Sequence, residues 1–61
     1  MFVEERQQRI LERLRGRGKV TVEELVAAFQ VSAPTVRADL AALEARSLLR
    51  RTHGGALPAT N

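Results

Sequence analysis

Residues 29–40 read FQVSAPTVRADL, and this stretch decides the fold. The apolar pattern of a preceding helix stops at Phe29. Ser32 belongs to the residue types that commonly cap the start of a helix. Pro34 is tolerated in the first turn of a helix, and Val36 and Leu40 begin a new apolar stripe. The segment therefore predicts two steeply crossing helices joined by a turn of about three residues.

Two amphipathic helices are predicted before this turn. Thr21 and Glu24 form a capping box that opens a helix over residues 22–29. A first helix is predicted over about residues 3–16, and it stops at two nearby glycines. Both carry apolar residues at helical spacing and should pack on each other: Val3, Ile10, Leu11 and Leu14 in the first, Val22, Leu25, Val26 and Phe29 in the second.

A third helix is predicted over about residues 33–46, and a two-stranded hairpin over about residues 48–57 follows it. The strands are indicated by apolar residues on both sides of a glycine turn, namely Leu48, Leu49, Ala56 and Leu57 around His53-Gly54-Gly55. Leu57 and one of the two earlier leucines are expected to face the helices. Residues 19–21 predict no more than a stub of extended chain. The fold class is therefore mainly α, a winged helix-turn-helix with a C-terminal two-stranded wing.

The chain has 61 residues, which is one small domain that must be held together by apolar packing. It has no Cys and one His, so neither a disulfide framework nor a metal cluster is expected, and no cofactor is predicted. No apolar run is long enough to cross a bilayer, which favours a cytoplasmic protein without a membrane partner. A phosphate loop ending at Gly18-Lys19 would need glycine at position 13, which is Arg13. No catalytic residues and no enzyme activity are predicted.

Positive charge is concentrated at the two ends of the chain. The formal net charge is +3 and the sequence pI is about 11.1. Residues 1–19 hold six cations against three acids, and residues 47–61 add two arginines and one histidine without an acid. One explanation of this charge is that it merely keeps the protein soluble. Binding to a polyanion is favoured if the fold brings both basic ends to one face.

The outward face of the third helix consists of small residues. With Val36, Leu40 and Leu43 facing inward, a helical wheel puts Thr35 and Arg37 on the two shoulders. The outermost positions are Pro34, Ala38, Ala41 and Ala45. Alanine is a strong helix former, which is one explanation. The other is that this helix must approach another surface closely.

If that surface is DNA, each residue type has a suitable contact. Arg37 can reach guanine or phosphate, Ser32 and Thr35 can bind phosphate or base edges, and alanine methyl groups can touch thymine methyl groups. Arg50, Arg51 and His53 border the glycine turn, where a basic hairpin can follow the DNA backbone or enter the minor groove. Alternatively, this is a solvated turn whose arginines pair with Asp39 or Glu44. We expect one arginine to pair inward and the other to face phosphate.

The same residues carry a resemblance to a known family. The runs VSAPTVRADL at 31–40, LE at 43–44 and LLRRTHGGA at 48–56 resemble the amino-terminal domain of the DeoR family of bacterial transcription regulators. The resemblance implies a domain, residues 1–57, that binds double-stranded operator DNA, usually for a repressor of carbohydrate or nucleoside metabolism. Members carry a larger second domain that senses a phosphorylated sugar and assembles the oligomer. Residues 58–61 would then be a linker, and the isolated domain would be monomeric.

Carried over by position, the resemblance implies DNA-contacting residues at the start of the third helix and in the wing. These are Ser32, Ala33, Pro34, Thr35, Arg37, Ala38, Arg51, His53 and Gly54. The chain departs from the family pattern at Ala38, where a second arginine is usual, and at Ser47, where glycine is usual. Serine adopts the required geometry there only with strain.

Two other classes of partner stay open. A winged-helix domain could dock a partner helix on Ala38, Ala41 and Ala45, in which case binding would survive salt. Structured RNA would be preferred over duplex DNA of the same sequence.

Overall fold

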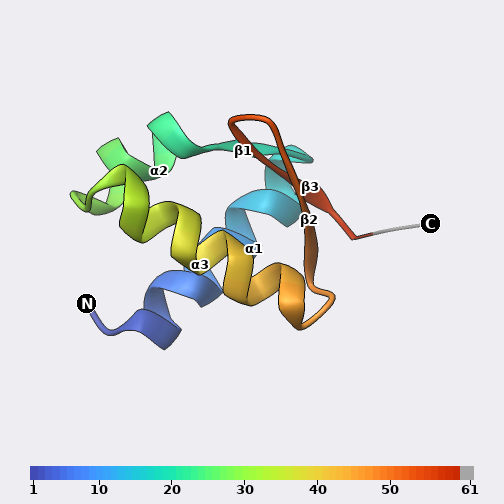
Figure 1. Ribbon diagram of the computed structural model, residues 1–61, viewed down its shortest axis with the longest axis horizontal. Helices are drawn as coiled ribbons and strands as arrows, with labels where there is room; N and C mark the ends of the chain where they lie inside the picture. The colour runs from blue at the N-terminus through green and yellow to red at the C-terminus, as the bar shows by residue number, and fades with distance from the viewer. Residues whose placement is uncertain (60–61) are drawn as a thin grey trace.

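The computed structural model describes residues 1–59 and confirms the predicted winged helix-turn-helix fold (Figure 1). Three helices are followed by a hairpin, and a short strand between the first two helices joins the sheet. The elements in chain order are α1 (Val3–Arg17), β1 (Val20–Thr21), α2 (Val22–Phe29), α3 (Ala33–Ala45), β2 (Leu49–Thr52) and β3 (Gly55–Pro58). Within residues 1–59 no helix is long and apolar enough to cross a membrane.

Local caps set both ends of the turn between α2 and α3. Gln30 ends α2 in the left-handed conformation with φ 56°, and its N–H donates to the Val26 carbonyl. Ser32 caps α3, because its hydroxyl accepts a hydrogen bond from the Thr35 N–H at 3.3 Å. Thr21 does the same for α2 through the Glu24 N–H at 3.1 Å. These caps confirm the turn of residues 30–32 that the sequence predicts.

The core lies where the three helices and the sheet meet. It contains ten buried apolar residues, to which every helix and strand contributes: Ile10, Leu14, Val20, Val22, Leu25, Val36, Leu40, Leu43, Leu49 and Ala56. Val3, which the spacing placed with the inward stripe of α1, is instead 50% exposed. It is the first residue of α1, and the buried stripe of that helix consists of Arg6, Ile10 and Leu14, so that part of the prediction was wrong.

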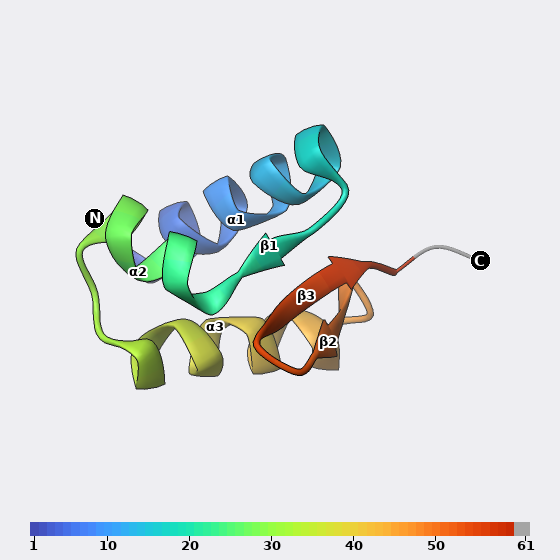
Figure 2. The ribbon, with the colours of Figure 1, turned by 90° about the horizontal axis from the view of Figure 1, so that it is seen from above.

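The sheet has the strand order β1-β3-β2 and is antiparallel throughout. The stub of extended chain is therefore a real strand, because Val20 pairs with Ala56 and Thr21 with Gly55. Figure 2 shows β1 running from the end of α1 to the start of α2 beside β3. A Cβ on Gly55 would lie 2.0 Å from the Val20 carbonyl oxygen, so only glycine allows this approach. The Val22 N–H also donates to the Gly54 carbonyl at 2.8 Å.

The register of the hairpin corrects one expected core residue. Leu49 is buried as predicted, but Leu57 is 42% exposed, and Ala56 fills the inward position instead. Successive side chains of a strand point to opposite faces, so Ala56 and Leu57 cannot both face the helices. Pro58 is the last residue of β3, so it is not part of a linker. Residues 60 and 61 of the predicted linker lie outside the described residues.

A buried ion pair joins α1 to α3. Arg6 and Asp39 are both buried, and the guanidinium donates to the carboxylate through Nε and, at 3.0 Å, through Nη2. The Gln7 side-chain amide donates to the same carboxylate at 3.3 Å. The hydrogen bond to Asp39 raises the pKa of Arg6 above its usual value. Asp39 therefore pairs with α1, and neither wing arginine is its partner.

The end of α3 is a Schellman motif closed by Ser47. The Ser47 N–H donates to the Glu44 carbonyl at 2.8 Å, and the Leu48 N–H donates to the Leu43 carbonyl at 3.0 Å. Ser47 has a φ of 62°, the left-handed conformation that favours glycine. The sequence predicted a strained serine at this position, and the structure places it there.

Replacing Ser47 with Gly is expected to raise the free energy of unfolding by about 0.5–1 kcal/mol. The left-handed conformation costs an ordinary residue about 1–2 kcal/mol, and the extra freedom of glycine in the unfolded chain offsets about half of that. Urea denaturation followed by circular dichroism measures the change. The control is Arg46→Gly, one residue earlier at φ −92°, which should lower stability. A Ser47→Gly variant no more stable than the parent chain would contradict the strain.

Candidate nucleic-acid interface

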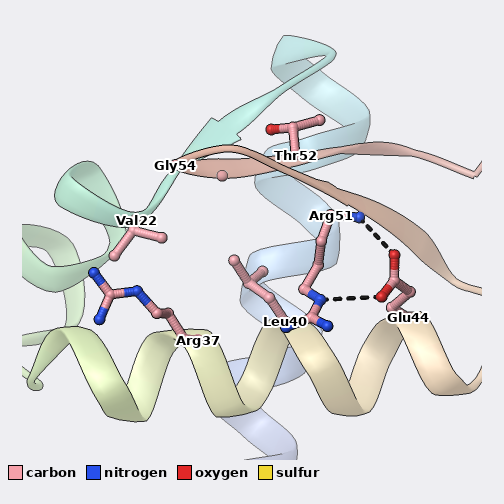
Figure 3. Close-up of a pocket in the computed structure, with 8 residues that line it drawn as sticks. Val22, Arg37, Leu40, Glu44, Arg51, Thr52 and Gly54 are labelled. Atoms are coloured by element: carbon pink, nitrogen blue, oxygen red, sulfur yellow. Dashed lines mark hydrogen bonds and ion pairs between the residues drawn. The ribbon is translucent and has the colours of Figure 1, made fainter.

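A groove separates α3 from the wing, and residues of opposite charge line it. Arg37, Leu40 and Glu44 come from successive turns of α3, and Arg51 and Thr52 come from β2 (Figure 3). Figure 3 shows Arg37 extended from α3 toward Val22, at the start of α2. The groove thus brings together Arg37 and Arg51, which the sequence predicted as DNA contacts and which lie 14 positions apart.

A second groove continues from the first toward the tip of the wing. It is lined by Arg37 and Ala33 of α3, by Glu23 at the start of α2, and by the turn residues His53 and Gly54. Gly54 has a φ of 87°, which explains the glycine in this two-residue turn. The predicted wing residues and the start of α3 therefore border one continuous surface.

The first turn of α3 presents small and hydroxyl side chains. Pro34 and Ala38 are exposed, Thr35 is half-buried, and Ala33 is half-buried against the core. The Ser32 hydroxyl donates to Thr35 Oγ1 at 3.0 Å. The two hydroxyl groups therefore lie side by side at the start of α3.

The small face of α3 is narrower than the helical wheel predicts. Ala38 and Ala45 are exposed, but Ala41 is half-buried. Asp39, which the wheel analysis did not count as inward, is buried by its pairing with Arg6. In the first two turns of α3, the outward positions Pro34, Arg37 and Ala38 are all exposed.

Glu44 at the end of α3 holds Arg51 of the wing. One carboxylate oxygen accepts the Arg51 backbone N–H at 2.9 Å, and the other accepts Nε at 3.0 Å. The backbone N–H bond, followed by the side-chain bond, lowers the pKa of Glu44 below its usual value. Arg50 is exposed and makes no ion pair with the described residues. Arg51 is thus the wing arginine that pairs with an acid, one of the two pairings the sequence left open.

The basic N-terminal segment joins this surface only in part. Lys19 lines a hollow on the wing with His53 and Leu57. Arg15, by contrast, lines a groove with Ser47 where α1 meets the end of α3. The two basic ends therefore do not converge fully, and the positive charge at the interface comes chiefly from α3 and the wing.

The sequence did not single out two residues that border these grooves. Thr52 lines both of them, and Glu23 lines the one at the tip of the wing. Alternation along β2 places Thr52 on the face opposite to Arg51, so it gave no indication that Thr52 borders the grooves. Residues 1–59 contain no cluster of three His, Cys, Asp or Glu side chains that could hold a metal ion.

Comparison with protein families matches residues 6–61 to the DeoR-like helix-turn-helix domain. The chain belongs to this family. Members are DNA-binding parts of transcription regulators, so this DeoR-like domain binds DNA. The match covers the helix-turn-helix and the wing that form the two grooves.

Curated relatives resemble the DeoR-like domain over most of its length. The HTH-type transcriptional regulator GolR of Listeria innocua is 44% identical over 57 residues, which are 93% of this chain and 22% of that protein. The lactose phosphotransferase system repressor of Lactococcus lactis is 47% identical over 51 residues, 84% of this chain and 20% of that protein. The glycerol-3-phosphate regulon repressor of Haemophilus influenzae has the same identity and coverage. This chain therefore spans about a fifth of the length of these relatives. No solved structure matches it significantly.

Proposed function

We propose that this DeoR-like domain reads operator DNA for a repressor of carbohydrate or nucleoside metabolism. The first two turns of α3 enter the major groove, and the wing follows the adjacent backbone. Arg37 reads guanine or binds phosphate, while Ser32, Thr35 and the wing residues Arg51 and His53 bind phosphate or base edges. Ala33, Pro34, Ala38 and Gly54 allow the close approach of the DNA.

One observation carries this proposal. Arg37 of α3 lies in both grooves, together with residues of the wing, while the neighbouring outward positions Pro34 and Ala38 are small and exposed. A helix whose outward side chains are small fits into the major groove of DNA. A cationic hairpin beside that helix then contacts the phosphates.

The whole regulator would contain more than this domain, since the relatives are several times longer. Two of them are named for lactose and glycerol-3-phosphate systems, which favours a carbohydrate regulon here. Its larger domain would bind a phosphorylated sugar and assemble the oligomer, through a linker that follows the wing. The isolated domain would be monomeric and bind weakly, because it contacts only one of the two operator half-sites that a dimer binds. Action on chromosomal DNA implies a cytoplasmic protein.

A salt titration tests the proposed function. The isolated chain is titrated against a fluorescently labelled random-sequence duplex, about two helical turns long, at several salt concentrations. The logarithm of the association constant should fall with the logarithm of salt, with a slope of about −0.9 for each phosphate contacted. A flat response would exclude DNA as the partner. Salt-resistant binding to a protein, lost in Ala41→Glu, would instead assign a protein-docking role, and a preference for RNA would assign RNA.

A further inference from the structure

Arg51 is bound by Glu44 through its backbone N–H and its Nε, while its two terminal nitrogens are not bound by Glu44. Glu44 takes its backbone N–H and its Nε, which leaves both terminal nitrogens without a hydrogen-bond partner among residues 1–59. The Arg51 side chain remains 48% exposed although it is paired. A guanidinium fixed through Nε presents its terminal N–H groups as a preformed fork, which suits a phosphate oxygen.

The location of this fork follows from the hairpin register. Arg51 pairs with Ala56, which is buried, so the Arg51 side chain starts on the face of the sheet turned toward α3. It reaches the groove that Arg37 also lines (Figure 3). A phosphodiester in this groove would lie between a cation from α3 and one from the wing.

Glu44 also accepts a hydrogen bond from the outer edge of the sheet. The strand order places β2 at the edge of the sheet, where alternate backbone N–H groups have no strand partner. Glu44 accepts one such N–H, from Arg51 itself, so a single carboxylate fixes both the strand and the side chain to α3.

We propose that Glu44 is a positioning residue for DNA binding, which holds Arg51 so that its free nitrogens take a backbone phosphate beside Arg37. This proposal rests on the proposed function, and it makes an unusual prediction. Glu44 is an acid beside a DNA-binding groove, and electrostatics alone requires that its removal tighten binding. If Glu44 positions Arg51, its removal weakens binding instead.

The test is Glu44→Ala in the isolated chain, assayed against the same random-sequence duplex at about 0.15 M salt. Ordering a long side chain at an interface has a free-energy cost that the free Arg51 must then bear on binding, so affinity should fall roughly two- to tenfold. The matched control is Glu23→Ala, which removes the same charge from the second groove. Glu23 makes no ion pair within the described part of the chain, so its removal should leave affinity equal or higher.

Repeating Glu44→Ala in an Arg51→Lys background separates positioning from a loss of fold. Lysine keeps the charge but has no fork for Glu44 to orient, so Glu44→Ala should then cause a smaller loss. An affinity of Glu44→Ala equal to or above that of the parent chain would overturn the proposal. So would an equal loss in both backgrounds, which would make Glu44 merely structural.

Circular dichroism shows whether each variant is folded at the assay temperature, and Glu44→Gln replaces Glu44→Ala if the latter is not. The parent chain is measured first. Absence of salt-dependent binding by the parent chain would reject the proposed function itself, a result distinct from any difference among the variants.

Discussion

Replacing Asp39 with Ala is expected to lower the free energy of unfolding by about 3–5 kcal/mol. The substitution leaves the Arg6 guanidinium buried between α1 and α3 without its carboxylate, and a buried unpaired charge is strongly unfavourable. A domain of 61 residues has about 3–9 kcal/mol of stability in total, so this loss amounts to at least about a third of it. Thermal and urea denaturation at neutral pH, followed by circular dichroism, measure the loss.

The chain contains a matched control for this effect. Glu5 and Arg9 form an ion pair at 2.9 Å with side chains 48% and 55% exposed. Glu5→Ala should cost only about 0.3–0.5 kcal/mol, because exposed pairs of this spacing contribute little. If Asp39→Ala cost no more than Glu5→Ala, the buried pair would not stabilise the packing of α1 on α3. Replacing both Arg6 and Asp39 with apolar residues of similar size should recover most of the loss.

Replacing Arg37 with Ala is expected to weaken specific DNA binding by about 1–3 kcal/mol, the cost of one lost bidentate base contact. Arg37 is the long cationic side chain in the exposed first two turns of α3, and it lines both grooves. The preferred sequence is first selected from a random duplex library by the parent chain. Affinities for the selected and random duplexes are then compared for the parent chain and the variant.

The ratio of the two affinities identifies the contact. Loss on the selected duplex alone assigns Arg37 to a base, and an equal loss on both assigns it to phosphate. Arg46→Ala is the control, since it removes the same charge from the exposed C-cap of α3, outside both grooves. An Arg37→Ala variant that binds both duplexes like Arg46→Ala would contradict its role at the interface.

The three helices were predictable because their signals are local. Caps at Thr21 and Ser32 and apolar spacing fix where α2 and α3 begin. β1 was not predictable, since two residues cannot show alternation and their partner Ala56 lies more than thirty positions away. Leu57 was placed inward for a related reason, because apolar character does not determine register.

The site followed from sequence less completely than the fold. The outward positions of Arg37 and Ala38 could be read from the helical wheel, but the groove between α3 and the wing depends on how the hairpin packs. The pairing of Arg6 with Asp39 left a usable signal, because Asp39 stands three positions after Val36 on the inward face. A charged residue at an inward position requires a buried partner. Arg6 left a matching signal, since it stands four positions before Ile10 on the inward stripe of α1.

The hydrogen bond from the Val22 N–H to the Gly54 carbonyl has a consequence for motion. The first N–H groups of a helix have no acceptor within that helix, so this amide depends on the hairpin alone for shelter from solvent. Its deuterium uptake therefore reports each lifting of the hairpin from the helices, independently of the unwinding of α2. The exchange rate of this one amide proton thus measures how firmly the wing is attached to the helices.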